Sequence, residues 1–329
     1  MSQAPEQEGV DASPAYARTA GTVRFTVAIC TWNRCHLLAQ TLERMTRLVI
    51  PPGVEWELLV VDNNSTDATP GVVHQYAARL PIRGFFEPRA GKPHALNLAV
   101  REARGDYILW TDDDVLVDPQ WAVEYCRAFE RWPDAALFGG RIIPWFAGTP
   151  PRWLKQVLPR VPGVYAMRDF GEEPVPLTHF LVPFGANMAV RTDVQRRYPY
   201  DASLGPSPVR TFGGEETALV RAMLAAGEQG WWIPTAAVRH YIAEHRQTTR
   251  YIRRYLTSFG ESAGAHLSMP AGHTMMRRPL WLWKQTIAAE ARYAVRRCTA
   301  PPRIWIEDLI HASLARGQWR AYGAGPRRA

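Results

Sequence analysis

The feature that most constrains the fold is an alternation of strand and helix patterns along residues 23–114. Aliphatic and β-branched runs typical of buried strands occur in "VRFTVAICTW", "EWELLVVDNN", "IRGFFEP" and "GDYILWTDDD". Apolar residues at helical spacing lie between them, in "CHLLAQTLERMTRL", "DATPGVVHQYAARL" and "KPHALNLAVREAR". Because strand–helix–strand units cross over right-handed, the pattern predicts an α/β domain with a mostly parallel sheet and helices on both faces.

Polar clusters follow three of these strands, in "TWNR", "DNNSTD" and "TDDD". Ligands of such sheets bind beyond the carboxyl ends of the strands, so converging clusters there indicate a site. The second cluster has an alternative interpretation, because its Asp and Asn residues could merely form an Asx turn and cap the next helix.

The third cluster contains three consecutive aspartates directly after the apolar residues 107–110. Adjacent carboxylates repel one another and resist burial unless a cation or a hydrogen-bonding ligand offsets their charge. Magnesium or manganese suits one or two carboxylates plus phosphate oxygens, which favours a nucleoside diphosphate as partner. The chain contains neither GxxxxGK[ST] nor GxGxxG, so the familiar glycine-rich phosphate loops are excluded.

Composition agrees with an ordinary globular protein, since 47% of the 329 residues are hydrophobic. Residues 1–22 show no basic head or apolar run and are expected to form a disordered leader, not a signal peptide. No stretch has the roughly 18 to 20 apolar residues of a spanning helix, so a soluble or peripheral protein on the cytoplasmic side is expected. The four cysteines form no CxxC pair, which suits free thiols in a reducing compartment.

The net charge of +8 lies entirely in residues 271–329, which hold eleven Lys and Arg against three acidic residues. The stretches "PLWLWKQTIAAEARYAVRR" and "PPRIWIEDLIHASLARGQWR" place aromatic and aliphatic residues at helical spacing beside basic ones. Two interpretations stay open: interfacial helices on an anionic membrane surface, or helices packed on the rest of the protein with solvated Lys and Arg.

Five motifs in order, "VAICTWNR", "ELLVVDNNSTDAT", "GKPHALNLAVREARGDYILWTDDDVLVDPQW", "FGANMAVRTD" and "GGEETALVRAMLAAG", resemble the family 2 glycosyltransferases. The resemblance implies a GT-A fold over residues 23–264, with residues 265–329 as a basic, Trp-rich helical extension. It also implies an inverting, metal-dependent transfer of a sugar from a nucleotide-sugar, expected to be a UDP-sugar.

The resemblance assigns the nucleotide-sugar site to several strand ends. Thr31 and Arg34 match the segment around the base, and Asp62 matches the aspartate that hydrogen-bonds the base. Lys92 matches a basic position near the base and diphosphate. Leu96 stands where the family pattern usually has arginine, so a contact from that position is not expected.

The aspartate cluster matches the DxD motif, with Asp112 near the ribose and Asp114 as direct ligand of Mg²⁺ or Mn²⁺. Asp112 is counted as a further metal ligand, and Asp113 is placed with the nucleotide-sugar contacts. His240 matches a position that supplies a metal ligand in some relatives, although an isolated histidine is more often packed or solvent-facing.

The motif "GGEETALVRAML" resembles the family's catalytic "GEDxxL", which makes Glu216 the expected base and Glu215 a residue that holds the acceptor or the loop. The two could exchange roles, or both could merely be favoured by the start of a helix. Arg250, in "QTTRY", is a candidate diphosphate contact, and Asn187 a candidate contact in the sugar pocket. Residues 148–177 are expected to set acceptor specificity or to be a passive insertion.

The expected acceptor is a glycan or a lipid-linked molecule at the cytoplasmic face, in the biosynthesis of cell-envelope polysaccharide. A haloacid-dehalogenase-like phosphohydrolase is disfavoured, because its aspartate motif usually follows the first strand and here it follows the fourth. Nucleic-acid binding is disfavoured because the basic excess lies outside the acidic cluster and no nucleic-acid motif is present. A non-catalytic relative that binds nucleotide or carbohydrate is the stronger rival, since Glu216 stands where aspartate is commonest.

Overall fold

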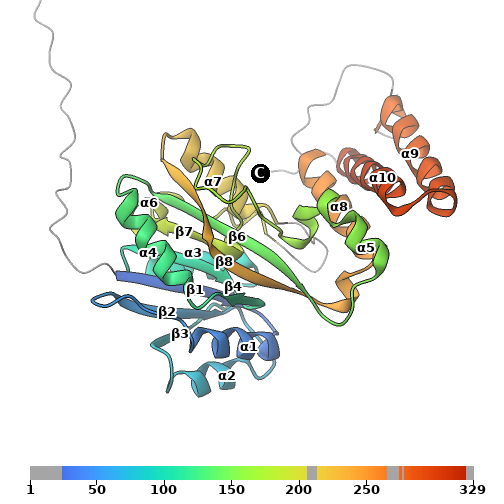
Figure 1. Cartoon of the computed structure of the whole chain (residues 1–329). Coiled ribbons are helices and arrows are strands. Elements are labelled where there is room, and N and C mark those ends of the chain that lie inside the picture. Colours follow the sequence, from blue (N-terminus) through green and yellow to red (C-terminus); the bar gives the residue numbers. More distant parts are fainter. Residues whose placement is uncertain (1–23, 206–212, 265–273, 276–277, 324–329) are drawn as a thin grey trace, which may run out of the picture.

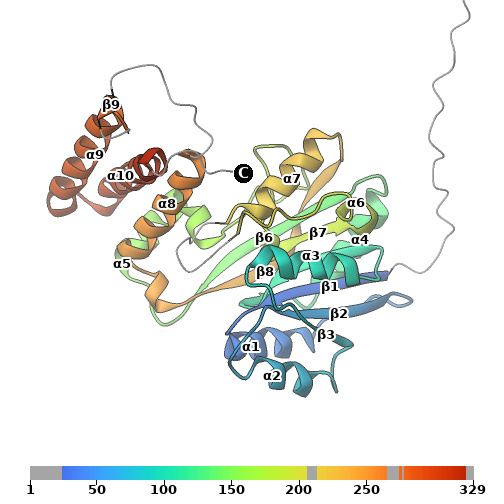
Figure 2. The ribbon, with the colours of Figure 1, turned by 180° about the vertical axis from the view of Figure 1, so that it is seen from behind.

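The computed structural model describes residues 24–205, 213–264, 274–275 and 278–323. The expected leader, residues 1–22, lies outside them. An α/β domain built on one large sheet and a lobe of helices beside it make up the described chain (Figures 1 and 2).

The large sheet has the strand order β3-β2-β1-β4-β7-β6-β8-β5. Its strands are β1 (Arg24–Thr31), β2 (Glu55–Asp62), β3 (Ile82–Phe86), β4 (Tyr107–Asp112), β5 (Val115–Val117), β6 (Leu137–Phe146), β7 (Met188–Arg191) and β8 (Gly230–Ile242). The strands β3, β2, β1 and β4 are parallel, as the alternating pattern predicts. The sheet as a whole is mixed, because β7 runs antiparallel to β4 and β6, and β5 antiparallel to β8.

Helices cover both faces of this sheet. They are α1 (Cys35–Met45), α2 (Thr69–Tyr76), α3 (Lys92–Glu102), α4 (Trp121–Arg131), α6 (Thr192–Gln195) and α7 (Glu215–Ala225). On one face Val27 and Ile29 of β1 share a core with α1 and α4, and on the other Ala28 shares a core with α3 and α7. The alternation of strand side chains between two buried faces explains why the strands read as continuous apolar runs.

The long strands β6 and β8 extend from the sheet toward the helical lobe (Figure 1). Between β6 and β7 lie α5 (Arg152–Val157) and the short 3-10 helices η1 (Leu158–Arg160), η2 (Pro162–Tyr165) and η3 (Gly185–Asn187). After β8 come η4 (Glu244–Arg246), α8 (Thr249–Gly264), the small strands β9 (Thr274–Met275) and β10 (Arg278–Pro279), α9 (Leu280–Thr299) and α10 (Pro302–Gly323).

The lobe has its own core, in which Leu154 and Val157 of α5 and Tyr165 of η2 meet Ile252 of α8 and Trp305 of α10. The chain around α5 therefore joins the C-terminal helices to the α/β domain. Among the described residues, no helix is long and apolar enough to cross a membrane.

Candidate active site

The carboxyl ends of β1, β2 and β4 lie side by side, because Thr31 pairs with Asp62 and Cys30 with Asp112 across the parallel ladders. The three polar clusters of the sequence therefore meet at one edge of the sheet. This convergence follows from the register of the strands and needs no long-range loop.

Asp113 is the inward-facing member of the aspartate cluster and is buried. Its carboxylate accepts hydrogen bonds from the Thr31 hydroxyl at 2.8 Å and the Arg34 guanidinium at 2.9 Å, and its backbone carbonyl accepts one from Thr41. Burial raises the pKa of Asp113, the charge of Arg34 opposes this shift and the charge of Asp114 adds to it, so that the pKa is about 6. Thr31 and Asp113, both expected to contact the nucleotide, contact each other here.

Asp112, Asp114 and His240 form a cluster whose ligand atoms all lie within 4.8 Å of one another. His240 reaches the aspartates because β8 pairs with the short strand β5, which begins one residue after Asp114. Asp114 Oδ1 lies 3.3 Å from His240 Nε2, and this oxygen and His240 Nδ1 are buried with no hydrogen-bond partner among the described residues. Two carboxylates and an imidazole are suitable ligands of a divalent cation, and the oxygen Oδ1 of Asp114 is free to bind one.

Asp114 is held in the charged form that a cation needs. Burial alone would raise its pKa, but His240, Arg34 and Arg246 together lower the pKa below the usual range. Arg34 Nη1 donates to Asp114 Oδ2 at 3.1 Å, and Arg246 Nη1 lies 3.7 Å from the same oxygen. Because Arg34 and Arg246 both approach Oδ2 of Asp114, the other oxygen, Oδ1, has no hydrogen-bond partner among the described residues and lies next to His240.

Lys92 connects the aspartate cluster to the expected catalytic pair. Its ammonium donates to Asp112 Oδ1 at 2.9 Å and to Glu216 Oε1 at 2.8 Å, which joins the first turns of α3 and α7. Burial would lower the pKa of Lys92, but Asp112, Glu216 and Glu215 raise it well above its usual value. Gly185 allows this arrangement, because a Cβ there would stand 2.4 Å from Glu216 Oε1.

Glu215 lies deeper than Glu216, with only 3% of its surface exposed. Its Oε2 has no hydrogen-bond partner within the described chain. Burial, and next the charge of Glu216, raise the pKa of Glu215 to about 7, against the opposing charge of Lys92. The two adjacent carboxyl groups therefore have different environments.

A cavity of about 150 Å³ brings these groups together. It is lined by Lys92, Asp112, Gly163, Val164, Ala166, Phe184, Ala186, Gly213, Gly214, Glu215, Glu216, Thr217, His240, Arg246 and Tyr255. Two of the expected metal ligands, Asp112 and His240, thus line the same cavity as the expected base, Glu216. The segment between β6 and β7 and helix α8 form another wall of this cavity.

Asn187 does not lie in this cavity, and its prediction as a pocket contact is wrong. It is fully buried, accepts hydrogen bonds from Trp121 Nε1 and the Tyr125 hydroxyl, and donates to two backbone carbonyls. All of its hydrogen-bonding capacity serves to hold α4, β6 and β8 against η3. A buried structural amide and a ligand-binding amide look alike in sequence.

Arg250 has an exposed side chain that forms no ion pair with any described residue, and its contact with the diphosphate stays a prediction. Arg246, four residues earlier, lies beside Asp114 and lines the cavity, with its Nε donating to the Tyr251 hydroxyl at 3.0 Å. The sequence analysis missed Arg246, although the run "HRQTTR" contains both arginines and gives no local reason to prefer one of them as a ligand of the site.

Asp62 takes part in a turn, which is the alternative that the sequence offered for its cluster. Its Oδ1 accepts a hydrogen bond from the backbone N–H of Ser65, three residues on, at 2.9 Å, which stabilises the turn at the end of β2. A contact between Asp62 and the nucleotide base stays a prediction.

Solved structures with similar architecture define the class of protein. One is Staphylococcus aureus TarS 1–349 (TM-score 0.52, 15% identity, 91% of each chain covered). Another is the mannosyltransferase PcManGT from Pyrobaculum calidifontis, in complex with GDP-Man and Mn²⁺ (TM-score 0.51, 19% identity, 90% of this chain and 88% of that one). The architecture is that of the GT-A glycosyltransferases.

The family model for glycosyl transferase family 2 matches residues 26–196, and the chain belongs to this family. The succinoglycan biosynthesis protein ExoM of Rhizobium meliloti is 23% identical over 76% of this chain and 77% of its own length. The glucosyl-dolichyl phosphate glucuronosyltransferase of Haloferax volcanii is 22% identical over 68% of this chain and 71% of its own. The protein is therefore a glycosyltransferase.

Proposed function

We propose that the protein transfers a sugar from a UDP-sugar to an acceptor hydroxyl by single displacement with inversion, in a reaction that depends on Mn²⁺ or Mg²⁺. The observation that carries the proposal is one cavity lined by Asp112, His240, Lys92 and Glu216, with Asp114 in the same cluster of potential metal ligands. Mn²⁺ in the neighbour PcManGT supports the choice of cofactor.

In this proposal Asp112, Asp114 and His240 hold the cation, which when bound neutralises negative charge on the departing diphosphate. Arg246 and Arg34 lie beside Asp114 and add positive charge at the same end of the cavity. Lys92 orients Glu216 and is available to the diphosphate, as its place in the sequence motif suggests.

Glu216 is proposed as the general base that accepts the proton of the acceptor hydroxyl. Its carboxylate is fixed by Lys92 and by the close approach of Gly185, and it is less deeply buried than Glu215. Glu215 is proposed to hold the loop or the acceptor, since burial favours its neutral, hydrogen-bond-donating form.

The acceptor is proposed to be a glycan or a lipid-linked molecule of a polysaccharide pathway of the cell envelope. The names of the two relatives support this choice, one a succinoglycan biosynthesis protein and the other acting on glucosyl-dolichyl phosphate. We place the enzyme in the cytoplasm, with the outer face of α9 on the membrane surface.

Calorimetric titration of UDP, GDP and dTDP, with and without Mn²⁺, tests the proposal. UDP is expected to bind only with the metal, and Asp114→Asn is expected to abolish that binding while leaving the fold intact. Asp134→Asn, on an exposed aspartate outside the cavity, is the matched control and should bind as the wild type does. Binding of GDP or dTDP in place of UDP would overturn the donor, and no binding of any nucleotide would overturn the whole proposal. Binding without sugar transfer would favour the non-catalytic alternative.

A further inference from the structure

Asn63, the residue after β2, is buried and gives its whole side-chain amide to one loop. Its Nδ2 donates to the backbone carbonyls of Glu87 at 3.1 Å and Arg89 at 2.7 Å, and its Oδ1 accepts a hydrogen bond from the backbone N–H of Gly91 at 3.0 Å. All three partners lie in the loop 87–91, which joins β3 to α3. Both amide hydrogens are used, so this side chain has no donor left for a ligand.

The ends of the neighbouring strands hold Asn63 itself in place. Its backbone N–H donates to the carbonyl of Thr31, the last residue of β1, at 2.9 Å. The backbone N–H of Glu87 donates to the carbonyl of Asp62, also at 2.9 Å. The loop 87–91 is therefore tied to the edge of the sheet at its beginning, in its middle and at its end.

The loop 87–91 ends at the residue before Lys92. Gly91 has φ +125°, a backbone conformation that L side chains rarely adopt, and Lys92 is the first residue of α3. Because the N–H of Gly91 is bound to Asn63, this turn fixes the direction in which α3 begins. A small rotation of the turn would displace the far end of the long Lys92 side chain.

The ammonium of Lys92 has to meet two carboxylates that belong to other elements. Asp112 ends β4 and lies 2.9 Å from Lys92 Nζ, and Glu216 lies in the first turn of α7, at 2.8 Å. Lysine carries its charge on a flexible stem of four carbons. Bringing one ammonium within hydrogen-bonding distance of both carboxylates therefore requires a fixed starting point, which the amide of Asn63 provides.

We propose that Asn63 is a positioning residue for Lys92, whose amide fixes the loop 87–91 and so directs the ammonium to Asp112 and Glu216. The proposal rests on the proposed function in that Glu216 is the proposed base and Lys92 the group that orients it. Asn63 is not one of the residues that line the catalytic cavity. It acts on the reaction through Lys92 and not by touching a substrate.

The ammonium of Lys92 can be observed directly, because the chain contains only three lysines, Lys92, Lys155 and Lys284. The other two are exposed. In protein labelled with ¹⁵N-lysine, without nucleotide or metal, NMR is expected to show Lys92 as a distinct ammonium signal, since charge-assisted hydrogen bonds to two carboxylates hold its protons. Lys92→Met assigns the signal. A wild-type Lys92 ammonium that behaves like the two exposed ones would overturn the proposal.

Asn63→Ala is expected to abolish the distinct signal or to move it to the position of the exposed lysines. Asn63→Asp is the second variant: it keeps an oxygen for the N–H of Gly91 but turns another oxygen toward the two loop carbonyls, and the same change is expected. The backbone amide signals of Lys155 and Lys284 in the same spectra show that each variant is folded. An unchanged Lys92 signal in a folded variant would overturn the proposal.

Asn97→Ala is the matched control for α3. The amide of Asn97 also binds backbone groups on both sides, donating to the carbonyl of Tyr200 at 2.8 Å and accepting from its N–H at 2.9 Å. It holds the helix that carries Lys92, but not the loop before it. The Lys92 signal should therefore stay as in the wild type.

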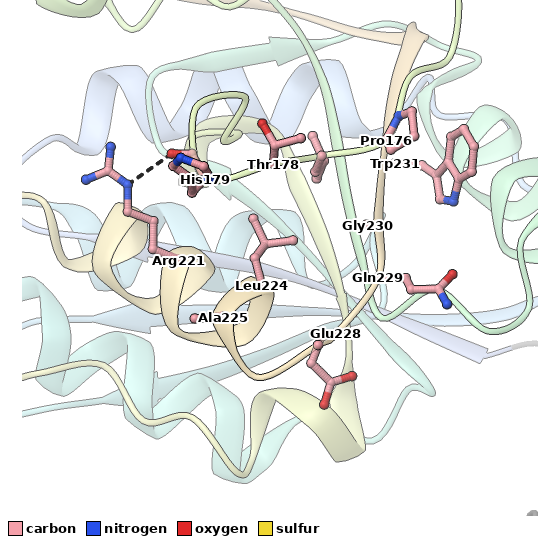
Figure 3. A pocket seen from close by; sticks show the side chains of 12 residues that line it. Pro176, Thr178, His179, Arg221, Leu224, Ala225, Glu228, Gln229, Gly230 and Trp231 are labelled. Atoms are coloured by element: carbon pink, nitrogen blue, oxygen red, sulfur yellow. Dashed lines mark hydrogen bonds between the residues drawn. The ribbon is translucent and has the colours of Figure 1, made fainter.

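Arg221→Gln is the corresponding control for α7, the helix that carries Glu216. The Nε of Arg221 donates to the backbone carbonyl of His179 at 3.3 Å, as the dashed line in Figure 3 shows. This contact lies in the wall of an open cavity of about 610 Å³ that shares no lining residue with the catalytic cavity. The variant should keep the Lys92 signal. A loss in either control as complete as in Asn63→Ala would show general loosening and overturn the proposal.

Titration of UDP with Mn²⁺ into the same wild-type protein tests the proposed function separately. If no nucleotide binds, the proposed function fails, while the NMR spectra still decide whether Asn63 positions Lys92. If UDP binds and the Lys92 signal is the same in the Asn63 variants as in the wild type, only the positioning role fails.

Discussion

Glu215 and Glu216 are neighbours in the chain, but the start of α7 points them into different surroundings. Both line the cavity, but Glu216 pairs with Lys92, whereas Glu215 is more deeply buried and has a carboxyl oxygen without a hydrogen-bond partner among the described residues. We expect Glu216→Gln to lower the rate of sugar transfer by roughly 10²- to 10⁴-fold, the contribution of a general base. The measurement is UDP release from a UDP-sugar with acceptor present.

Nucleotide binding by Glu216→Gln should stay close to that of the wild type, because the substitution keeps the shape of the side chain. Glu215→Gln should lose much less activity. The reverse result, with Glu215→Gln inactive and Glu216→Gln active, would show that the two carboxyl groups exchange the proposed roles.

The pKa of Glu215 also predicts how stability depends on pH. Its folded pKa of about 7 exceeds the usual 4.5, so between these values the folded state holds a proton that the unfolded chain has lost. The free energy of unfolding should therefore fall as pH rises through this range, by about 3 kcal/mol at most from this group. Urea unfolding of metal-free wild type and Glu215→Gln at pH 5 and pH 8 measures it. A pH dependence that is the same in both proteins would contradict the assignment.

At the scale of elements, the helical lobe depends on a close crossing of α8 and α10 through glycines. A Cβ on Gly317 of α10 would stand 2.2 Å from the backbone oxygen of Thr257, and one on Gly260 of α8 would stand 2.5 Å from that of Leu314. Backbone atoms cannot move aside to relieve such a clash as the end of a flexible side chain can. The two helices therefore approach as closely as they do only because these positions lack a side chain.

We expect Gly317→Ala to destabilise the protein by about 1–3 kcal/mol through overpacking, even though alanine favours a helix. Gly71→Ala is the matched control, because Gly71 lies in α2 with nothing within 4 Å of the added Cβ. The control should be stabilised by about 0.5–1 kcal/mol. Thermal and urea unfolding measure both variants, and a stabilised Gly317→Ala would mean that the helices are not in this contact.

At the scale of the whole molecule, α9 presents an apolar face that the described residues leave partly exposed. Trp281 is 47% exposed, Ile287 63% and Val295 62%, and they lie on one side of the helix with Lys284 between them. The one acid of α9, Glu290, is half-buried and pairs with Arg253 and Arg316 of the neighbouring helices. An exposed apolar stripe with basic and no free acidic groups has the character of an interfacial helix on an anionic membrane.

We expect the wild type to sediment with phosphatidylglycerol-containing vesicles and less with phosphatidylcholine alone, and more weakly as salt is raised. The double variant Trp281→Ser, Ile287→Ser should lose most of this binding while keeping nucleotide affinity. Val49→Ser, which removes an exposed apolar residue far from α9 in the chain, should change nothing. Equal sedimentation of wild type and the double variant would mean that this face has another role.

The two helices of the C-terminal extension differ in their surroundings. Helix α10 packs against α5 and α8, as the packed-helix interpretation predicts, while much of α9 is exposed and its binding to a membrane stays a prediction. The basic residues of α9 also differ from one another. Arg292 and Arg296 pair with the buried Asp308 of α10, whereas Lys284 pairs with no described acid.

The sequence alone determined the parallel half of the sheet and the meeting of Thr31, Asp62 and Asp112, because local alternation sets strands and helices and parallel strands end at one edge. The family motifs also indicated Asp112, Asp114 and His240 as metal ligands; the structure brings the three together, and their binding of a metal stays a prediction. Only the tertiary structure decided the roles of residues distant from these motifs. Asn187 is buried because α4, β6 and β8 close around it, and Arg246, not Arg250, lies beside Asp114. Such outcomes depend on which groups distant in the sequence the fold brings within hydrogen-bonding distance, and no local pattern records that distance.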